Sequence, residues 1–223
     1  MRTIRVTGKG RIKIRPDMTR ITITLEGTYD EYSETLQKSA LHTDRLKDVL
    51  AAFGFERGDL KTLSFDVDTE YEGYKDRKGV YKQRFIGYKF RHILKVEFDS
   101  DNERLGKILY ALANCELKPE FRLSYTIKDP EAAKNELLGR AVTDAKEKAA
   151  VLSAAAGVVL KAIQSIDYSW GEIDFEVRPM NRNKMLADAG VCYGASSAAD
   201  YDLNIEPDDI EVADTVTVIW EIE

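Results

Sequence analysis

The stretch TIRVTGKGRIKIR, residues Thr3–Arg15, alternates apolar and polar residues almost without interruption. Its apolar residues occupy even positions: Ile4, Val6, Ile12 and Ile14. A period of two predicts a β-strand with one buried face. Gly8 and Gly10 fall on that same face, where glycine indicates either a bulge or the close approach of another backbone.

Two more segments repeat this pattern. After a turn at Pro16 and Asp17, the residues Ile21, Ile23 and Leu25 alternate with polar neighbours, so we expect this strand to form a hairpin with the first. The closing segment alternates in the same way, with Ile210, Val212, Val216, Val218, Trp220 and Ile222 inward and Asp214 as a break that suggests a bulge. A strand at the chain's end must pair with earlier strands, which ties the C-terminus into the sheet.

The middle of the chain predicts a helix followed by a long hairpin. An apolar stripe covers residues 30–53 and ends at Gly54. Alternating residues then predict two strands: Leu63, Phe65, Val67 and Tyr71 on the first, and Ile86, Tyr88, Phe90, Leu94, Val96 and Phe98 on the second. Lys75–Gly79 forms the turn. Because these strands are unusually long, the tip is expected to extend past the core.

Two further helices carry sequence signals for their ends. Ser100 and Glu103 match a capping box. Asp129 followed by Pro130 predicts the start of a long alanine-rich helix that Gly157 ends. Its expected buried stripe is Leu138, Ala141, Val142, Ala145, Ala149, Leu152 and Ala156. A strand is expected near residues 160–168.

These elements predict an α+β protein in which a twisted antiparallel sheet of long strands is covered by amphipathic helices. We expect a single domain over residues 1–223, with an irregular arm or long loop at about 170–207. The 223 residues are 43% hydrophobic and 32% charged, with a net charge of −6, which disfavours general nucleic-acid binding. No segment is long and apolar enough to span a bilayer, and the N-terminal residues lack a signal-peptide pattern, so we expect a cytoplasmic location.

No residue pattern predicts a catalytic, metal or cofactor site. Gly8-Lys9-Gly10 lies inside a strand rather than before a helix, which is wrong for a phosphate loop. His42 and His92 have no second ligand at metal-binding spacing, and a hydrogen-bonded, partly buried side chain is the better interpretation of His92. The Asp99–Glu103 segment lacks the glycine and glutamate of a calcium loop.

The long hairpin is the candidate interaction surface. Aromatic and basic residues alternate there, and we single out Tyr74, Tyr81, Lys82, Arg84, Tyr88 and Lys89. Cations bind phosphates and aromatics stack on bases, so a face for single-stranded nucleic acid is one interpretation. The alternatives are a solvated hairpin whose charges deter aggregation and a contact for another protein.

Three blocks of the chain resemble the SIMPL domain family. They are the opening VTGKGRIKIRPD (Val6–Asp17) with the strand that follows it, AVTDAKEKAAVLSAAAGV (Ala141–Val158), and VADTVTVIWEI (Val212–Ile222). The resemblance implies an α+β domain without an assigned catalytic apparatus. Relatives include bacterial periplasmic antigens, an oxidative-stress defence protein and a eukaryotic signalling adaptor, and family members tend to self-associate.

We therefore expect a non-enzymatic SIMPL-like protein that acts by self-assembly, as a homo-oligomer, or by binding a protein partner. A link to stress defence rests on the resemblance alone. The alternative is a module for small ligands or single-stranded nucleic acid that uses the basic, tyrosine-rich hairpin at about 71–95, although nucleic acid is the less favoured partner.

Overall fold

The computed structural model describes residues 2–75, 79–168, 173–178 and 205–223. These residues form three helices and two antiparallel sheets, which confirms the α+β class. The chain divides into two compact units. The first contains Met1–Asp17, Tyr125–Val177 and Pro207–Glu223, and the second contains Met18–Ser124 and Arg178–Glu206. Most of the expected arm at 170–207 lies outside the described residues.

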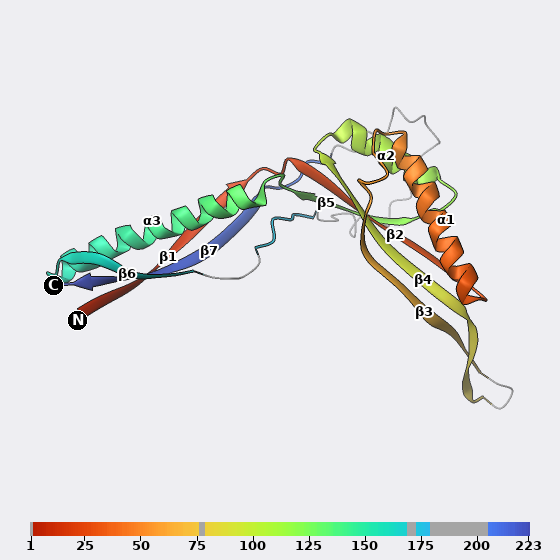
Figure 1. Ribbon diagram of the computed structural model, residues 1–223, viewed down its shortest axis with the longest axis horizontal. Coiled ribbons are helices and arrows are strands. Elements are labelled where there is room, and N and C mark those ends of the chain that lie inside the picture. Colours follow the sequence, from red (N-terminus) through yellow and green to blue (C-terminus); the bar gives the residue numbers. More distant parts are fainter. Residues whose placement is uncertain (1, 76–78, 169–172, 179–204) are drawn as a thin grey trace, which may run out of the picture. The chain divides into compact units, whose positions relative to one another are not determined.

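In the first unit, one long helix covers one face of a three-stranded sheet (Figure 1). The strands are β1 (Arg2–Ile14), β7 (Ile210–Ile222) and β6 (Leu160–Tyr168), in the order β1-β7-β6, and the helix is α3 (Pro130–Ala156). The first and last strands pair along their whole length, from Arg2 opposite Ile222 to Ile14 opposite Ile210. The prediction that the C-terminal strand joins the sheet is confirmed.

The expected hairpin between the first two strands is wrong. β1 pairs with β7, whereas β2 (Met18–Tyr29) belongs to the other sheet. Asp17 fixes the chain where it leaves β1, because its backbone N–H donates to the carbonyl of Thr126 and its carboxylate accepts from the backbone N–H of Lys128. The apolar row of β2 is thereby free to join the core of the second unit.

The glycines of β1 mark the close approach of α3. The β1–β7 register is unbroken through Gly8, Gly10 and Asp214, so none of them is a bulge in this pair. A Cβ atom on Gly8 would lie 2.0 Å from the carbonyl oxygen of Ala141, and one on Gly10 would lie 2.1 Å from that of Leu137. The helix backbone therefore rests directly on the strand, at a distance that only glycine permits.

This close approach also determines which residues of α3 are buried. Its buried residues recur every four positions: Ala133, Leu137, Ala141, Ala145, Ala149 and Ser153. Leu138 and Val142 lie at the flank, partly buried, and the expected burial of Leu152 and Ala156 is wrong, since both are exposed. All of these residues except Leu137 are small, because larger side chains along the centre line would hold the helix away from the sheet.

Side chains of α3 also cover the open edge of β1. The backbone N–H of Lys9 donates to the Asp144 carboxylate at 2.6 Å, and the Arg140 guanidinium donates to the carbonyl of Arg11 at 3.1 Å. Lys148 donates to the carbonyl of Thr7 at 3.5 Å. These contacts satisfy main-chain groups that an edge strand otherwise offers to other chains.

The second unit is a four-stranded sheet with two helices on one face. Its strands are β2, β3 (Lys61–Lys75), β4 (Tyr81–Asp99) and β5 (Glu120–Thr126), in the order β3-β4-β2-β5. The helices α1 (Tyr32–Ala51) and α2 (Asn102–Asn114) pack on β2 and β4 through a core that includes Ile23, Leu46, Phe90, Leu94, Ile108 and Leu112. The helix–hairpin–helix order predicted from the sequence is therefore present.

The helix caps differ at one position from the prediction. Asp129 accepts a hydrogen bond from the backbone N–H of Ala132, and Gly157 ends α3 at φ +67°, as expected. The N-cap of α2 is Asp101 rather than Ser100, because the Asp101 carboxylate reaches the backbone N–H of Arg104 at 3.0 Å. Ser100 instead lies 3.4 Å from the hydroxyl of Thr19.

The expected inward row of β3 is largely exposed. Leu63 is 54% exposed, Phe65 42% and Tyr71 51%. β3 is the edge strand of the sheet, and α1 packs over β2 and β4. The row faces the helical side of the sheet, but no helix lies over it in the described part of the chain.

Candidate functional site

The candidate site is the outer half of the β3–β4 hairpin. The two strands pair from Lys61 opposite Lys95 to Lys75 opposite Tyr81. Every described residue from 71 to 86 is exposed, so the hairpin extends past the core as predicted. The expected turn contains residues 76–78, which lie outside the described residues.

A row of aromatic rings runs along one face of this hairpin. Tyr71 contacts Phe85 edge to face at 5.7 Å, Phe85 contacts Tyr88 at 5.3 Å, and Tyr88 contacts Tyr32 at the start of α1 at 5.4 Å, all between ring centroids. We call these four residues the aromatic row. Edge-to-face pairs of this kind each contribute about 0.5–1.5 kcal/mol beyond the area that they bury. The row is therefore an ordered surface although most of it is exposed.

A β-bulge places Phe85 and Tyr88 on the same face. Glu70 lies opposite Gly87 and Tyr71 opposite Phe85, which leaves Ile86 as the extra residue. Gly87 has φ +147°, and a Cβ atom there would lie 2.4 Å from the carbonyl oxygen of Tyr29. An uninterrupted period of two would put residues 85 and 88 on opposite faces, so the sequence reasoning missed Phe85 and Tyr32. The glycine was the one available signal.

The six residues singled out from the sequence do not share one face. Strand alternation puts Tyr81 with the aromatic row, and Tyr88 belongs to it. Tyr74 and Lys82 lie opposite each other on the other face, together with Arg84. Lys89 lies further along β4.

Two of the basic side chains singled out in the hairpin, Arg84 and Lys89, have acidic partners. Arg84 forms an ion pair with Glu72 at 2.8 Å, and Lys89 forms one with Glu26 at 2.9 Å. The hydrogen bond and charge of Glu26 raise the pKa of Lys89 above its usual value. The ammonium of Lys75 lies 4.7 Å from the ring centroid of Tyr81. These pairs reduce the net positive charge available to a phosphate backbone, which favours the protein-contact interpretation over the nucleic-acid one.

Each ring nitrogen of His92 shares a hydrogen bond with a threonine hydroxyl. Its Nδ1 lies 3.1 Å from the hydroxyl of Thr43 and its Nε2 lies 2.9 Å from that of Thr62. Burial lowers the pKa of His92, and the positive charge of Lys47 adds to this effect. Burial also lowers the pKa of His42. His92 is thus the hydrogen-bonded histidine that the sequence predicted, and within the described residues no three His, Cys, Asp or Glu side chains gather to hold a metal ion.

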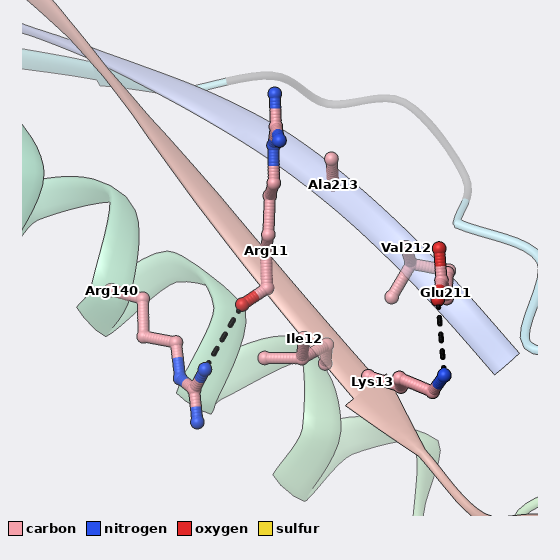
Figure 2. Close-up of a pocket in the computed structure, with 7 residues that line it drawn as sticks. All are labelled: Arg11, Ile12, Lys13, Arg140, Glu211, Val212 and Ala213. Atoms are coloured by element: carbon pink, nitrogen blue, oxygen red, sulfur yellow. Dashed lines mark hydrogen bonds and ion pairs between the residues drawn. The ribbon is translucent and has the colours of Figure 1, made fainter. Parts of the chain in front are cut away.

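A hollow in the first unit lies beside the end of β1 and the start of β7 (Figure 2). It holds about 470 Å³ and is lined by Arg11, Ile12, Lys13, Arg140, Glu211, Val212 and Ala213. Arg140 donates to the carbonyl of Arg11, and Lys13 pairs with Glu211 at 3.4 Å. The charged groups of Lys13, Glu211 and Arg140 are thus held by neighbours within the first unit.

The family model described as "SIMPL: Protein of unknown function (DUF541)" matches residues 4–220. The chain belongs to the SIMPL family. The resemblance stated from the three sequence blocks is therefore confirmed, and SIMPL family membership covers both units of the fold.

Two curated relatives of this SIMPL chain are named "26 kDa periplasmic immunogenic protein". The protein from Brucella abortus (strain S19) is 27% identical and that from Brucella melitensis biotype 1 is 26% identical, each over 163 residues. The match covers 73% of this chain but 65% of each relative, which is less than two thirds of their length. Neither these names nor the family description states an enzymatic activity.

The relatives' names do not fit the cytoplasmic location expected from the sequence, because both contain the word periplasmic. Among the described helices, none is long and apolar enough to cross a membrane.

Proposed function

We propose that this SIMPL protein is not an enzyme and acts through contacts with other protein molecules, either copies of itself or a separate partner. The observation that carries the proposal is the aromatic row. Tyr32, Tyr71 and Phe85 are 50%, 51% and 43% exposed, yet their rings are held in edge-to-face contact. Rigid, exposed aromatics lose little conformational entropy on binding and dominate the energetics of protein interfaces.

Light scattering with size separation tests this proposal on the full chain. The wild-type protein should show a mass above 25.3 kDa, or should elute with a second protein from its native source. Tyr71→Ser combined with Phe85→Ser should shift the mass to that of one chain without a partner. Tyr74→Ser is the matched control because it removes a tyrosine from the opposite face of the same hairpin, and it should leave the mass unchanged.

A wild-type chain that stays strictly monomeric and elutes alone would refute the proposal. An equal effect of Tyr74→Ser would also count against it, because the contact would then not depend on the aromatic row.

A role in stress defence and the cellular location are secondary parts of the proposal. Deletion of the gene should lower tolerance to peroxide if the stress role holds, and unchanged tolerance would remove it. Cell fractionation decides between the cytoplasm expected from the sequence and the periplasm named for the relatives.

A further inference from the structure

The free edge of β3 differs from the free edge of β1. The edge of β1 is covered by Arg140, Asp144 and Lys148 of α3. β3 pairs with β4 on one side, and among the described residues no strand lies on its other side. The described hydrogen bonds also include none from a side chain to the backbone of β3. Its outward-pointing N–H and C=O groups can therefore pair with an added strand.

The regular part of this edge lies between two bulges. Register shifts occur between Thr62 and Ser64 and again between Glu70 and Tyr71. Residues 64–70 between them pair continuously with β4. Seven residues in regular geometry are enough for a strand of ordinary length to pair alongside.

The two faces of this segment differ in chemistry. Asp66, Asp68 and Glu70 alternate along one face, and no ion pair holds Asp66 or Asp68 in the described part of the chain. The cations opposite them on β4, Arg91 and Lys89, pair with Glu26 instead. Four carboxylates, those of Asp66, Asp68, Glu70 and Glu26, thus share two cations, which leaves this acidic row with an excess of negative charge.

The other face of the segment is mostly apolar, with Phe65, Val67 and Thr69. Phe65 and Val67 point to the helical side of the sheet, where Phe65 packs against His92 at 5.1 Å between ring centroids. The exposed Leu36 lies on α1, which covers β4 but not β3. An added strand would place its apolar side chains beside Phe65 and Val67 and its other side chains beside the acidic row.

We propose that residues 64–70 bind, by strand addition, an extended segment of a partner protein in which apolar and basic residues alternate. Main-chain hydrogen bonds supply affinity, and the match of lysine or arginine to Asp66, Asp68 and Glu70 sets the register, because a slip by one residue would put the charges on the apolar face. This proposal rests on the proposed function and names the chemistry of the partner.

The probe is a fluorescein-labelled nine-residue peptide of alternating lysine and valine, added to the full-length chain and followed by fluorescence anisotropy. We expect salt-sensitive binding that Asp66→Lys with Asp68→Lys weakens by about tenfold, since each exposed charge pair contributes about 0.2–1 kcal/mol. Asp167→Lys is the matched control, because it reverses an exposed carboxylate on β6, the edge strand of the other sheet. It should leave binding unchanged.

Two further measurements do not depend on altering the protein. A peptide with glutamate in place of lysine should not bind, and one with N-methyl groups along one edge should bind at least tenfold more weakly. Hydrogen exchange with the peptide bound should slow amides within residues 64–70.

Equal binding of the glutamate peptide, an equal effect of Asp167→Lys, or bound peptide without protection of residues 64–70 would each overturn the proposal. If the double variant instead turned an oligomer into a monomer, the edge would be occupied by a second copy, and the separate partner would be excluded. Failure of the peptide to bind would also overturn the strand-addition proposal, but it would leave the proposed function intact, because the light-scattering experiment tests that function independently.

Discussion

Replacing Gly8 by alanine should destabilise the first unit more than any other single methyl group added to β1. The new Cβ would lie 2.0 Å from the carbonyl oxygen of Ala141 and 2.4 Å from the backbone nitrogen of Ala145. Ordinary contact between heavy atoms begins near about 3.5 Å, so α3 would have to move by about 1.5 Å. That movement would separate Ala141 and Ala145 from Val6, Val218 and Trp220, which form one buried cluster with them.

The expected cost is about 3 kcal/mol, the upper end of the range for overpacked cores, because helix backbone atoms cannot rotate away as a side chain can. With a urea dependence of about 2 kcal/mol per molar, the unfolding midpoint should fall by about 1.5 M. Urea titration followed by far-ultraviolet circular dichroism measures this shift, and loss of hydrogen-exchange protection in α3 assigns it to the first unit.

Gly139→Ala is the control. Gly139 lies on the exposed side of α3, and a Cβ atom there would meet nothing within 4 Å. Alanine should raise the stability by about 1 kcal/mol because it restricts the unfolded chain and favours the helix. A Gly8→Ala midpoint equal to that of the wild type would refute the close approach. Full rescue by Ala145→Gly would refute it too, because that change removes the Ala145 Cβ at 2.7 Å but keeps the two closer backbone atoms.

Three further outcomes follow from local contacts. Asp129→Ala should lower the stability of the first unit by about 1 kcal/mol through loss of the N-cap bond to Ala132, measured by urea unfolding, with an unchanged midpoint as the contrary result. Burial alone would raise the pKa of Glu97, but hydrogen bonds from Arg20 and Lys95 and their charges outweigh it and hold that pKa below the usual 4.5. The stabilisation from Glu97 is therefore present above about pH 4.5 and lost as the pH falls through the lowered pKa. Glu97→Gln should then make the free energy of unfolding fall less steeply as the pH is lowered below about 4.5. An unchanged slope in urea titrations at a series of pH values would contradict this. Burial lowers the pKa of both histidines, so NMR titration should give midpoints below 6.5 for His42 and His92. The neutral histidines stabilise the fold above that pH, and this contribution is lost as the pH falls through the lowered pKa. A midpoint above 6.5 for either histidine would contradict this expectation.

The candidate site was only partly predictable from the sequence. The alternating residues of β3 and β4 predicted a long hairpin whose tip leaves the core, and both features are present. Which side chains of the hairpin share a face was not predictable, because the single extra residue at Ile86 reverses the alternation of β4 beyond it. Phe85 therefore joins Tyr88, whereas Tyr74 and Arg84 lie on the other face.

The sequence by itself determined what depends on near neighbours. Period-two runs specified the strands, and Asp129 with Pro130 and Gly157 specified the ends of α3. The glycines on the inward row of β1 indicated either a bulge or a close approach, and only the structure decided between the two. These features are set by local dihedral preferences and by hydrogen bonds over a few residues.

Only the tertiary structure decided which strands pair and which apolar rows are buried. Thr7 and Thr217, 210 positions apart, share a hydrogen bond across β1 and β7, while β2 pairs with β4 in the other sheet. Phe65 has the same alternation as buried strand residues but lies on an edge that α1 does not cover. Pairing and coverage depend on packing between segments distant in the chain, and alternation alone is the same for an edge strand and for a central one.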